Sequence, residues 1–296
     1  MLLSEFIKEA LSALEGLYPV PEARSLVNLL CEHELGVKSY THIIEPQYLV
    51  PDDKLEGLSS AIDRLAMGEP IQHIIGSAPF CGRSFRVSRD VLIPRPETEL
   101  LVNEAAKEIL RLRSERGEGS SVRVLDLCTG SGCIAWTLAL PPAMAEVVAV
   151  DVSEKALEVA SSQVFGHEIE ERAHARPLFV QADILDTEQD FEHGLFNLIL
   201  SNPPYIKESE KALMRSNVLD YEPHIALFVS DDDPLLFYRA VAKWATRFLR
   251  DGAMGIVEIN ETLGDETMAL FRDAGFRELR LIKDFYNKKR FVSFRK

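Results

Sequence analysis

The chain has 296 residues, of which 46% are hydrophobic, so it is long enough to form two domains with buried cores. Its 47 acidic and 33 basic residues give a net charge of −14, and the sequence contains no basic arm that would grip a phosphate backbone, which disfavours a nucleic-acid-binding protein. No apolar run reaches the roughly 20 residues of a transmembrane helix, and the four cysteines and seven histidines show no zinc spacing, so we expect a cytoplasmic protein with free thiols, no bound metal and no membrane contact.

Residues 1–70 have the pattern of a small helical bundle. Apolar side chains recur at helical spacing, beginning with Phe6, Leu11, Leu14 and Leu17, and prolines separate the expected helices. Charged side chains among the first ten residues predict an amphipathic helix and not a signal peptide. The region holds 12 acidic and 5 basic residues, which is consistent either with a solvated surface or with a docking module for a basic partner.

Residues 71–95 predict a β-hairpin linker. Apolar positions alternate around two glycines, namely Ile71, His73 and Ile75 before Gly76, and Phe80, Phe85 and Val87 around Gly82.

Residues 96–296 predict a doubly wound, Rossmann-like α/β domain, because strand and helix patterns alternate. Strands are expected over residues 122–127, 147–150, 178–180, 197–200, 254–259, 279–282 and 291–294. Helices are expected over residues 133–140, 153–165, 235–249 and 262–274, and a polar loop over residues 116–121.

A glycine-rich turn follows the first strand of this domain and leads into a helix. It reads Asp126-Leu127-Cys128-Thr129-Gly130-Ser131-Gly132. Glycines let such a turn approach a ligand closely, although they also serve simple chain reversal. The turn lacks both the GxGxxG spacing of dinucleotide sites and the lysine of a phosphate-binding loop. A ligand without phosphate is therefore favoured, and the sulfonium cation of S-adenosylmethionine suits the carboxylate of Asp126.

Polar and apolar residues after the next two strands are candidates for the same ligand. The second strand ends at Asp151, 25 positions after Asp126, where a carboxylate can accept hydrogen bonds from ribose hydroxyls. Asp183 and Ile184 follow the third strand, a position that flanks adenine in methyltransferases of this architecture. Asp183 is also explained as a turn cap.

The fourth strand ends in Ser201-Asn202-Pro203-Pro204-Tyr205. Ligands of open α/β sheets bind at the carboxyl ends of the strands, so we expect the chemistry here. Asparagine and proline pairs are also common in turns, and the position after the fourth strand is what favours a catalytic role.

The residue types in this motif suit methyl transfer to a planar nitrogen. An amide or aryl amino nitrogen has a delocalised lone pair, and two acceptors that hold its N–H groups help to aim this lone pair at the methyl carbon. We expect the Asn202 side-chain oxygen and the Pro203 carbonyl to be these acceptors. Pro203 and Pro204 fix the turn, and Tyr205 can stack on the planar group.

With these motifs in order, the chain closely resembles the peptide chain release factor glutamine methyltransferases over nearly its whole length. The catalytic motif carries the resemblance together with the segment Val91-Leu92-Ile93-Pro94-Arg95-Pro96-Glu97-Thr98-Glu99. The helical N-terminal region, the hairpin and the C-terminal segment with Lys283-Asp284-Phe285 and Arg290-Phe291-Val292 also match the family.

The resemblance implies methylation of the glutamine in the Gly-Gly-Gln loop of class I release factors, with S-adenosylmethionine as the methyl donor, in support of translation termination. It implies cofactor contacts by Cys128, Thr129, Gly130, Ser131, Gly132, Asp151, Ile184 and Asn202, and glutamine contacts by Asn202, Pro203, Pro204 and Tyr205. The segment with Arg95 borders the active site in the family, and Phe80 stands where an aromatic residue is often near it.

One position departs from the commonest family pattern. Cys128 stands where the family often has glycine, and cysteine disfavours a positive φ angle. We therefore expect this residue to have an ordinary, negative φ.

Three other functions share part of this pattern. An adenine amino methyltransferase uses the same motif on a planar amine, but it must flip a base and would need a basic surface or a recognition domain. A methyltransferase for a ribosomal-protein glutamine has the same chemistry. A non-enzymatic binding module is disfavoured because the catalytic tetrapeptide is intact.

Overall fold

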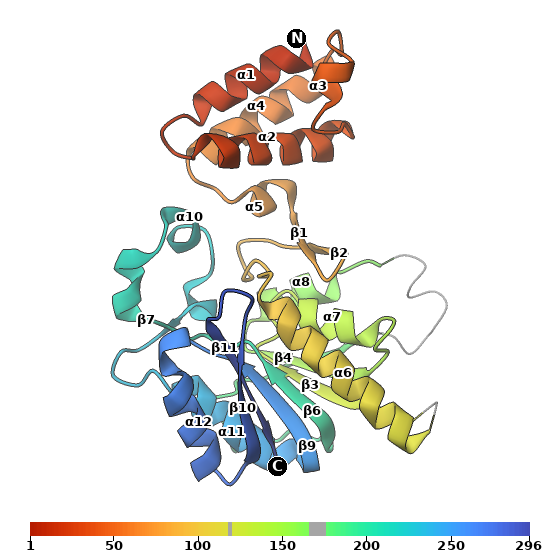
Figure 1. Cartoon of the computed structure of the whole chain (residues 1–296), viewed down its shortest axis with the longest axis vertical. Coiled ribbons are helices and arrows are strands. Elements are labelled where there is room, and N and C mark those ends of the chain that lie inside the picture. Colours follow the sequence, from red (N-terminus) through yellow and green to blue (C-terminus); the bar gives the residue numbers. More distant parts are fainter. Residues whose placement is uncertain (118–119, 166–175) are drawn as a thin grey trace. The chain divides into compact units, whose positions relative to one another are not determined.

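The computed structural model describes residues 1–117, 120–165 and 176–296 (Figure 1). The polar loop expected over residues 116–121 therefore lies partly outside the described residues. The chain divides into two compact units. Met1–Ser77 and Arg215–Tyr221 form the first, and Ala78–Met214 and Glu222–Lys296 form the second.

The first unit is a helical bundle, as the apolar spacing predicts. Its helices bury a shared apolar core that includes Leu14, Val27, Leu30 and Leu58, each at most 1% exposed. One helix ends at Gly36, whose φ of 67° gives the left-handed cap that glycine adopts without strain. The helices are α1 (Leu3–Ala13), α2 (Val20–Leu35), α3 (Thr41–Ile44), α4 (Asp52–Ala66) and α5 (Ile71–Ile75).

A distant segment completes this unit. Arg215–Tyr221, which contains the short helix α10 (Ser216–Leu219), is grouped with the bundle. The Tyr221 hydroxyl donates to the Met67 carbonyl at 3.0 Å, and Arg215 pairs with Glu22 at 3.3 Å. The sequence alone did not indicate this association.

The linker differs in part from its predicted form. Residues Ile71–Ile75 form helix α5 and not a strand, because Pro70 precedes a helical turn that Gly76 closes with a φ of 70°. The hairpin itself is present as strands β1 (Ser77–Phe80) and β2 (Arg83–Arg86). The first unit extends through Ser77, beyond the boundary expected at residue 70.

The second unit contains a seven-stranded sheet with the order β10-β11-β9-β6-β3-β4-β5. Five neighbouring strands are parallel, and β11 runs antiparallel to both of its neighbours. The strands are β3 (Arg123–Leu127), β4 (Glu146–Asp151), β5 (Leu178–Gln181), β6 (Phe196–Ser201), β9 (Leu249–Glu258), β10 (Arg277–Lys283) and β11 (Lys289–Arg295).

Helices cover both faces of this sheet, so the expected doubly wound α/β fold is confirmed (Figure 1). Helices α6 (Thr98–Arg116) and α7 (Cys133–Ala139) lie on one face, and α11 (Leu236–Phe248) and α12 (Gly264–Asp273) lie on the other. Helix α8 (Glu154–Ser161) packs beside β4 and β5. Shorter elements are η1 (Glu208–Leu213), η2 (His224–Ala226), η3 (Glu261–Leu263), β7 (Ile206–Lys207) and β8 (Phe228–Val229).

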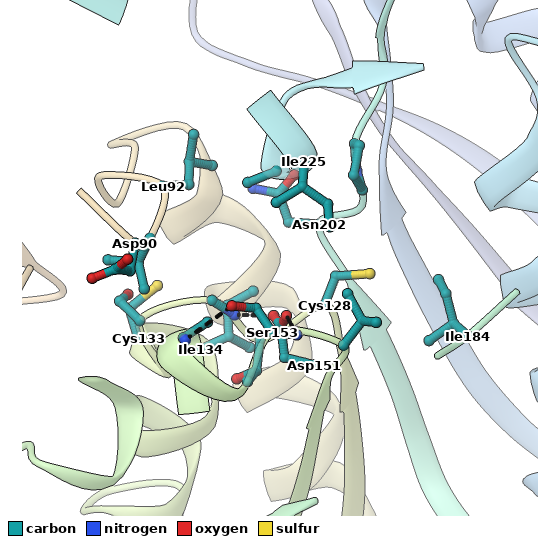
Figure 2. Close-up of a pocket in the computed structure, with 18 of the residues that line it drawn as sticks. Asp90, Leu92, Cys128, Cys133, Ile134, Asp151, Ser153, Ile184, Asn202 and Ile225 are labelled. Atoms are coloured by element: carbon teal, nitrogen blue, oxygen red, sulfur yellow. Dashed lines mark hydrogen bonds between the residues drawn. The ribbon is translucent and has the colours of Figure 1, made fainter. Parts of the chain in front are cut away.

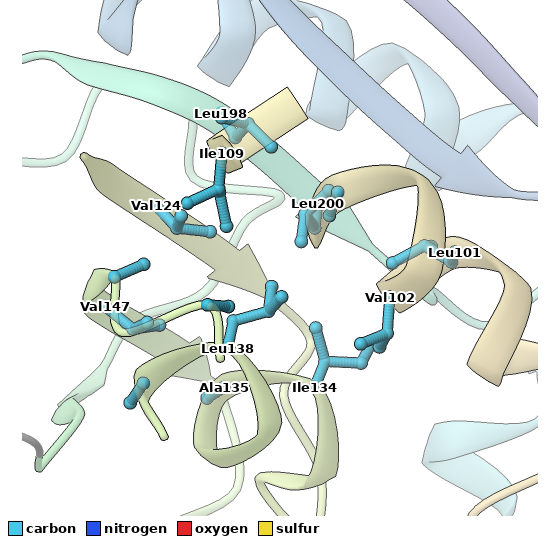
Figure 3. Close-up of a cluster of buried hydrophobic side chains, with 14 of the residues drawn as sticks. Leu101, Val102, Ile109, Val124, Ile134, Ala135, Leu138, Val147, Leu198 and Leu200 are labelled. Atoms are coloured by element: carbon cyan, nitrogen blue, oxygen red, sulfur yellow. The ribbon is translucent and has the colours of Figure 1, made fainter. Parts of the chain in front are cut away.

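Successive strand residues supply the two cores. Figure 3 shows Val124 of β3 and Leu198 of β6 facing Ile109 of α6, while Leu125 and Ile199 belong to the cluster on the opposite face. All five of these side chains are fully buried, and each contributes about 1.5–3 kcal/mol through burial. Because both faces are covered at the centre of the sheet, β3, β4 and β6 read as nearly continuous apolar runs in the sequence.

The strand order places a crevice in the middle of the sheet. The chain passes from β3 outward to β4 and β5, and then returns to β6 on the other side of β3. The two crossovers therefore diverge at the carboxyl ends of β3 and β6, which is where ligands bind in folds of this kind.

Candidate active site

A cavity of about 200 Å³ opens at these carboxyl ends, and its lining lies within the second unit. Figure 2 shows Cys128, Asp151, Ile184 and Asn202 pointing toward this pocket from four different strand ends. Predicted residues that line it are Arg95, Cys128, Thr129, Gly130, Ser131, Asp151, Asp183, Ile184, Asn202 and Pro204.

Asp126 supports the turn after β3 through a buried hydrogen bond. Its carboxylate is fully buried, accepts a hydrogen bond from the Thr129 hydroxyl at 2.6 Å and does not line the pocket. Burial raises the pKa of this carboxyl to about 7, against the hydrogen bond from Thr129. The geometry gives Asp126 a supporting position behind the residues that line the pocket.

Asp151 joins the turn to the end of β4. One carboxylate oxygen accepts from the Gly130 N–H at 2.9 Å, and the other accepts from the Ser153 N–H at 3.0 Å. Burial raises the pKa of Asp151, and the backbone donors oppose this shift. Each carboxylate oxygen has a second lone pair, so Asp151 can still accept hydrogen bonds from ribose hydroxyls.

The expectation of a negative φ angle at Cys128 is wrong. Its φ is +61°, in the left-handed region that the cysteine was expected to avoid. The turn reverses at this residue so that the Thr129 N–H reaches the Val150 carbonyl at 2.9 Å. A non-glycine residue in this region costs of order 1–2 kcal/mol, so the surrounding hydrogen bonds hold the turn against its local preference. Burial raises the pKa of the Cys128 thiol well above its ordinary value, which leaves the thiol protonated and neutral.

Gly132 lets the helix after the turn approach its neighbour. Its φ is +78°, and a Cβ at this position would lie 3.0 Å from the Ala160 Cβ and 3.2 Å from the Trp136 ring. Both the backbone conformation and the available space therefore require glycine here.

Asp183 and Ile184 lie at the end of the pocket beyond β5. Asp183 accepts a hydrogen bond from the Leu185 N–H at 2.9 Å, so it caps its own turn while it also lines the pocket. Ile184 is 4% exposed, and its carbonyl accepts from the Trp244 indole N–H at 2.9 Å. Both the cap and the pocket position that the sequence suggested for Asp183 are present.

The catalytic motif leaves β6 at the pocket wall. The Ser201 hydroxyl donates to the Leu127 carbonyl at 2.9 Å, which ties the end of β6 to the end of β3. Asn202 and Pro204 line the pocket, whereas Pro203 and Tyr205 do not. The Tyr205 hydroxyl donates to Glu258 at 3.0 Å, and burial raises its pKa, so this phenol stays neutral.

Two residues that the sequence did not single out as functional, Thr98 and Glu258, contact this motif, and Thr98 also lines the pocket. The Thr98 hydroxyl donates to Glu258 at 2.7 Å, and the Asn202 Nδ2 group lies 3.4 Å from the Thr98 oxygen. Thr98 and Glu258 are both 2% exposed. One feature of the sequence could have indicated Glu258. It is a carboxylate at the C-terminal end of β9, directly after an apolar run, and β9 pairs with β6.

A second buried carboxylate organises the segment with Arg95. Glu222 accepts from the Arg95 guanidinium at 2.6 Å and from the Ile93 N–H at 3.0 Å, and its side chain is 1% exposed. The ion pair holds Arg95 at the pocket edge. It leaves less of the guanidinium free for a substrate than the sequence suggested.

Phe80 is placed differently from the other candidates. Its side chain is 1% exposed, packs edge-on against Phe85 and belongs to the apolar core. It does not line the pocket, so the predicted substrate contact has no support in this geometry.

The residues that line the pocket suit a ligand that contains adenosine, carries a positive charge and has no phosphate group. Asp90, Asp151 and Asp183 line it, and the basic residue among its lining, Arg95, is paired with Glu222. In a phosphate-binding loop the backbone N–H groups donate hydrogen bonds to the phosphate. Here the Gly130 N–H donates to the Asp151 carboxylate instead. Apolar side chains such as Ile134 and Ile184 complete the wall. Within the described residues, no cluster of side chains is suited to a metal ion, and no helix is long and apolar enough to cross a membrane.

Two family descriptions match the chain. Residues 5–76 match the PrmC N-terminal domain, and residues 98–219 match the Methyltransferase small domain.

Relatives and solved structures extend this result. A protein of Bacteroides thetaiotaomicron named release factor glutamine methyltransferase is 38% identical, and the match covers 95% of each chain. A protein of the same name from Flavobacterium psychrophilum is 36% identical over 99% of this chain and 98% of its own. The hMettl16 catalytic domain, solved in complex with the MAT2A 3'UTR hairpin 6, has a TM-score of 0.53 at 12% identity and covers 81% of this chain and 82% of that one. The last similarity supports the fold alone.

Proposed function

The chain belongs to the family of release factor glutamine methyltransferases, and on that basis we propose that it methylates the side-chain amide nitrogen of the glutamine in the Gly-Gly-Gln motif of class I peptide chain release factors. The methyl donor in this proposal is S-adenosylmethionine. The release factor is the protein partner, and the modification supports translation termination.

The observation that carries the proposal is the position of Asn202. This residue lines the same pocket as Asp151 and the turn after β3, so an amide held by Asn202 would lie beside a cofactor held by that turn. Pro204 also lines the pocket, and Pro203 is buried beside it, which keeps the motif rigid.

The cofactor would be held by residues that already face the pocket. We assign the ribose to Asp151, the adenine to Asp183 and Ile184, and the remaining contacts to Cys128, Thr129, Gly130 and Ser131. When bound, S-adenosylmethionine supplies a methyl group on a positively charged sulfur, which leaves as a neutral thioether. The acidic lining of the pocket favours this cation.

The protein's contribution to the reaction is orientation. The Asn202 Oδ1 atom and the Pro203 carbonyl accept the two N–H groups of the substrate amide and turn its lone pair toward the methyl carbon. Tyr205 does not line the pocket, so the predicted stacking on the substrate is not part of this scheme, and its hydroxyl instead donates to Glu258. The nitrogen forms its new bond as the sulfur–carbon bond breaks, and the surplus N–H proton leaves to water. This scheme needs no covalent intermediate and no general base.

The proposal is tested with an unmodified class I release factor and the same factor with its Gly-Gly-Gln glutamine replaced by alanine. The purified protein is incubated with each factor and S-adenosylmethionine that carries a radioactive methyl group. We expect label on the first factor and none on the second. Label on both factors would move the modified residue elsewhere. Label on neither, with label on a ribosomal protein or on adenine-containing nucleic acid, would overturn the substrate.

A further inference from the structure

The proposed reaction depends on which end of the Asn202 side chain faces the substrate. The carbonyl oxygen can accept an amide N–H, whereas the amino group would repel it. The two ends have nearly the same shape, so packing alone does not distinguish them. The hydrogen bonds around the side chain must therefore decide the orientation.

A count of protons around Thr98 decides it. The Thr98 hydroxyl has one proton, and it donates this proton to Glu258 at 2.7 Å. Its oxygen can then only accept, so the group that lies 3.4 Å away must be the amino group of Asn202. The Oδ1 atom of Asn202 is then at the opposite end of the amide, and because Asn202 lines the pocket, this oxygen can accept a hydrogen bond from a ligand there.

The same carboxylate also holds the other end of the motif. The Tyr205 hydroxyl donates to the second oxygen of Glu258 at 3.0 Å. Asn202 and Tyr205 flank Pro203 and Pro204, so Glu258 is bound directly or through Thr98 to both ends of the rigid turn. Glu258 itself is fixed because it is 2% exposed at the end of β9.

We infer that Glu258 is a positioning residue that acts through Thr98 and Tyr205 to hold the Asn202 carbonyl oxygen toward the amide to be methylated. This inference rests on the proposed function, because it assigns a role within the same reaction. It also implies that the ionised form of Glu258 is the active one, since only a carboxylate accepts from both hydroxyls without offering a proton of its own.

The surroundings of Glu258 set the pH at which this role is lost. Burial raises the pKa of Glu258 to about 7, while the hydrogen bonds from Thr98 and Tyr205 and the charge of Arg290 oppose the shift. Glu97 raises it further, and the Tyr238 phenol also faces this carboxylate. Below this pH the protonated Glu258 can donate a hydrogen bond to the Thr98 hydroxyl oxygen. The Thr98 hydroxyl can then donate its own proton to Asn202. The Asn202 side-chain amide can therefore rotate by about 180°, so that its amino group and not its oxygen faces the substrate.

The test compares kcat and KM of the wild-type protein, Glu258→Gln and Glu108→Gln over roughly three pH units centred on about 7. Glu108→Gln is the matched control, because it makes the same change in a carboxylate of the same unit that is 6% exposed and does not line the pocket. We expect wild-type kcat to fall as the pH drops through about 7. We expect Glu258→Gln to lower kcat by about 10²-fold above that pH and to abolish the acid limb.

The KM for S-adenosylmethionine is expected to change by less than about threefold in Glu258→Gln, since Asn202 is displaced and the cofactor turn is not. Glu108→Gln is expected to keep the wild-type kcat and pH profile. A Glu258→Gln enzyme within about twofold of wild-type kcat would overturn the inference. An acid limb that persists in that variant would also overturn it and would assign the titration to another group, such as Asp126.

A second pair of variants tests whether a loss of kcat comes from the missing hydroxyl group or from a loss of folding. Thr98→Val removes the hydroxyl and keeps the shape, whereas Thr98→Ser keeps the hydroxyl. We expect Thr98→Val to reproduce the loss of kcat and Thr98→Ser to recover most of it, while both retain binding of S-adenosylhomocysteine. Equal activity of the two variants would contradict a role that acts through the hydroxyl.

The two proposals fail in different ways. If the wild-type protein does not label the release factor, the proposed substrate is wrong, and the same variants are then compared on the acceptor that is labelled. If the wild-type protein labels the release factor but Glu258→Gln does so equally well, the substrate stands and the positioning role is wrong.

Discussion

The backbone N–H of Gly130 donates a hydrogen bond of 2.9 Å to the Asp151 carboxylate, which joins the turn after β3 to the end of β4 beside the hydrogen bond from the Thr129 N–H to the Val150 carbonyl. Asp151 therefore has two effects at the same time. It fixes the shape of the turn, and it presents acceptor oxygens to the pocket that the turn encloses.

Asp151→Ala is expected to weaken binding of S-adenosylhomocysteine by about 10–100-fold, which corresponds to the loss of about 1.5–3 kcal/mol from hydrogen bonds to a charged group. Isothermal titration calorimetry measures this directly. Asp90→Ala removes another carboxylate from the pocket edge without affecting the turn, and we expect a change of less than about threefold. Equal losses in the two variants would mean that the pocket responds only to net charge.

Asn202→Ala is expected to lower kcat by about 10²–10³-fold, because one preorganised acceptor for the substrate amide is lost. Cofactor binding is expected to fall much less, since the turn after β3 is unchanged. Single-turnover methyl transfer and calorimetry on the same preparation separate the two effects. Near-normal turnover would reject the proposed mechanism, and equal losses would assign Asn202 mainly to the cofactor.

Gly132→Ala is expected to lower the free energy of unfolding by about 2–4 kcal/mol, because the new methyl group meets Ala160 and Trp136 in a backbone conformation that disfavours alanine. Gly130→Ala is the matched comparison. It has a φ of +54° but no atom within 4 Å of the new Cβ, so we expect a loss of only about 1 kcal/mol. Urea denaturation of both variants measures the difference, and losses of equal size would argue against a packing role for Gly132.

The ion pairs of Glu108 are expected to make the free energy of unfolding depend on pH in the acid range. Burial opposes ionisation of Glu108, but hydrogen bonds from Arg111 and Arg295 outweigh it and lower the pKa to about 2 from an ordinary 4.5. Because the folded-state pKa is lowered, the stabilising contribution is complete above about pH 4.5 and is lost as the pH falls toward 2. Glu108→Gln is expected to be less stable by about 1–3 kcal/mol at neutral pH, with a smaller difference in acid. A stability difference that does not depend on pH would reject this assignment.

The central strands β3, β4 and β6 were predictable because they are buried along nearly their whole length and therefore appear as mostly apolar runs. The pocket turn and the motif at Asn202 were predictable because each follows such a run directly. Ile71–Ile75 was wrong as a strand, since five residues are too few to separate one helical turn from an alternating pattern.

Other features depend on the tertiary structure. Thr98 and Glu258 are 160 positions apart, and only the register of α6 against β9 brings them together. The positive φ of Cys128 could not be read from a residue type that disfavours it, because the hydrogen bonds of the whole turn impose this conformation.

The grouping of Arg215–Tyr221 with the helical bundle has a consequence for how this protein can be divided. The polypeptide crosses between the units at three places, after residues 77, 214 and 221, so neither unit is a continuous stretch of sequence. A fragment that begins at residue 78 would retain a seven-residue insert deprived of the partners that Met67 and Glu22 provide. An exchange of the bundle between two relatives therefore has to transfer both segments together, and a single junction near residue 77 would produce a mismatched chimera.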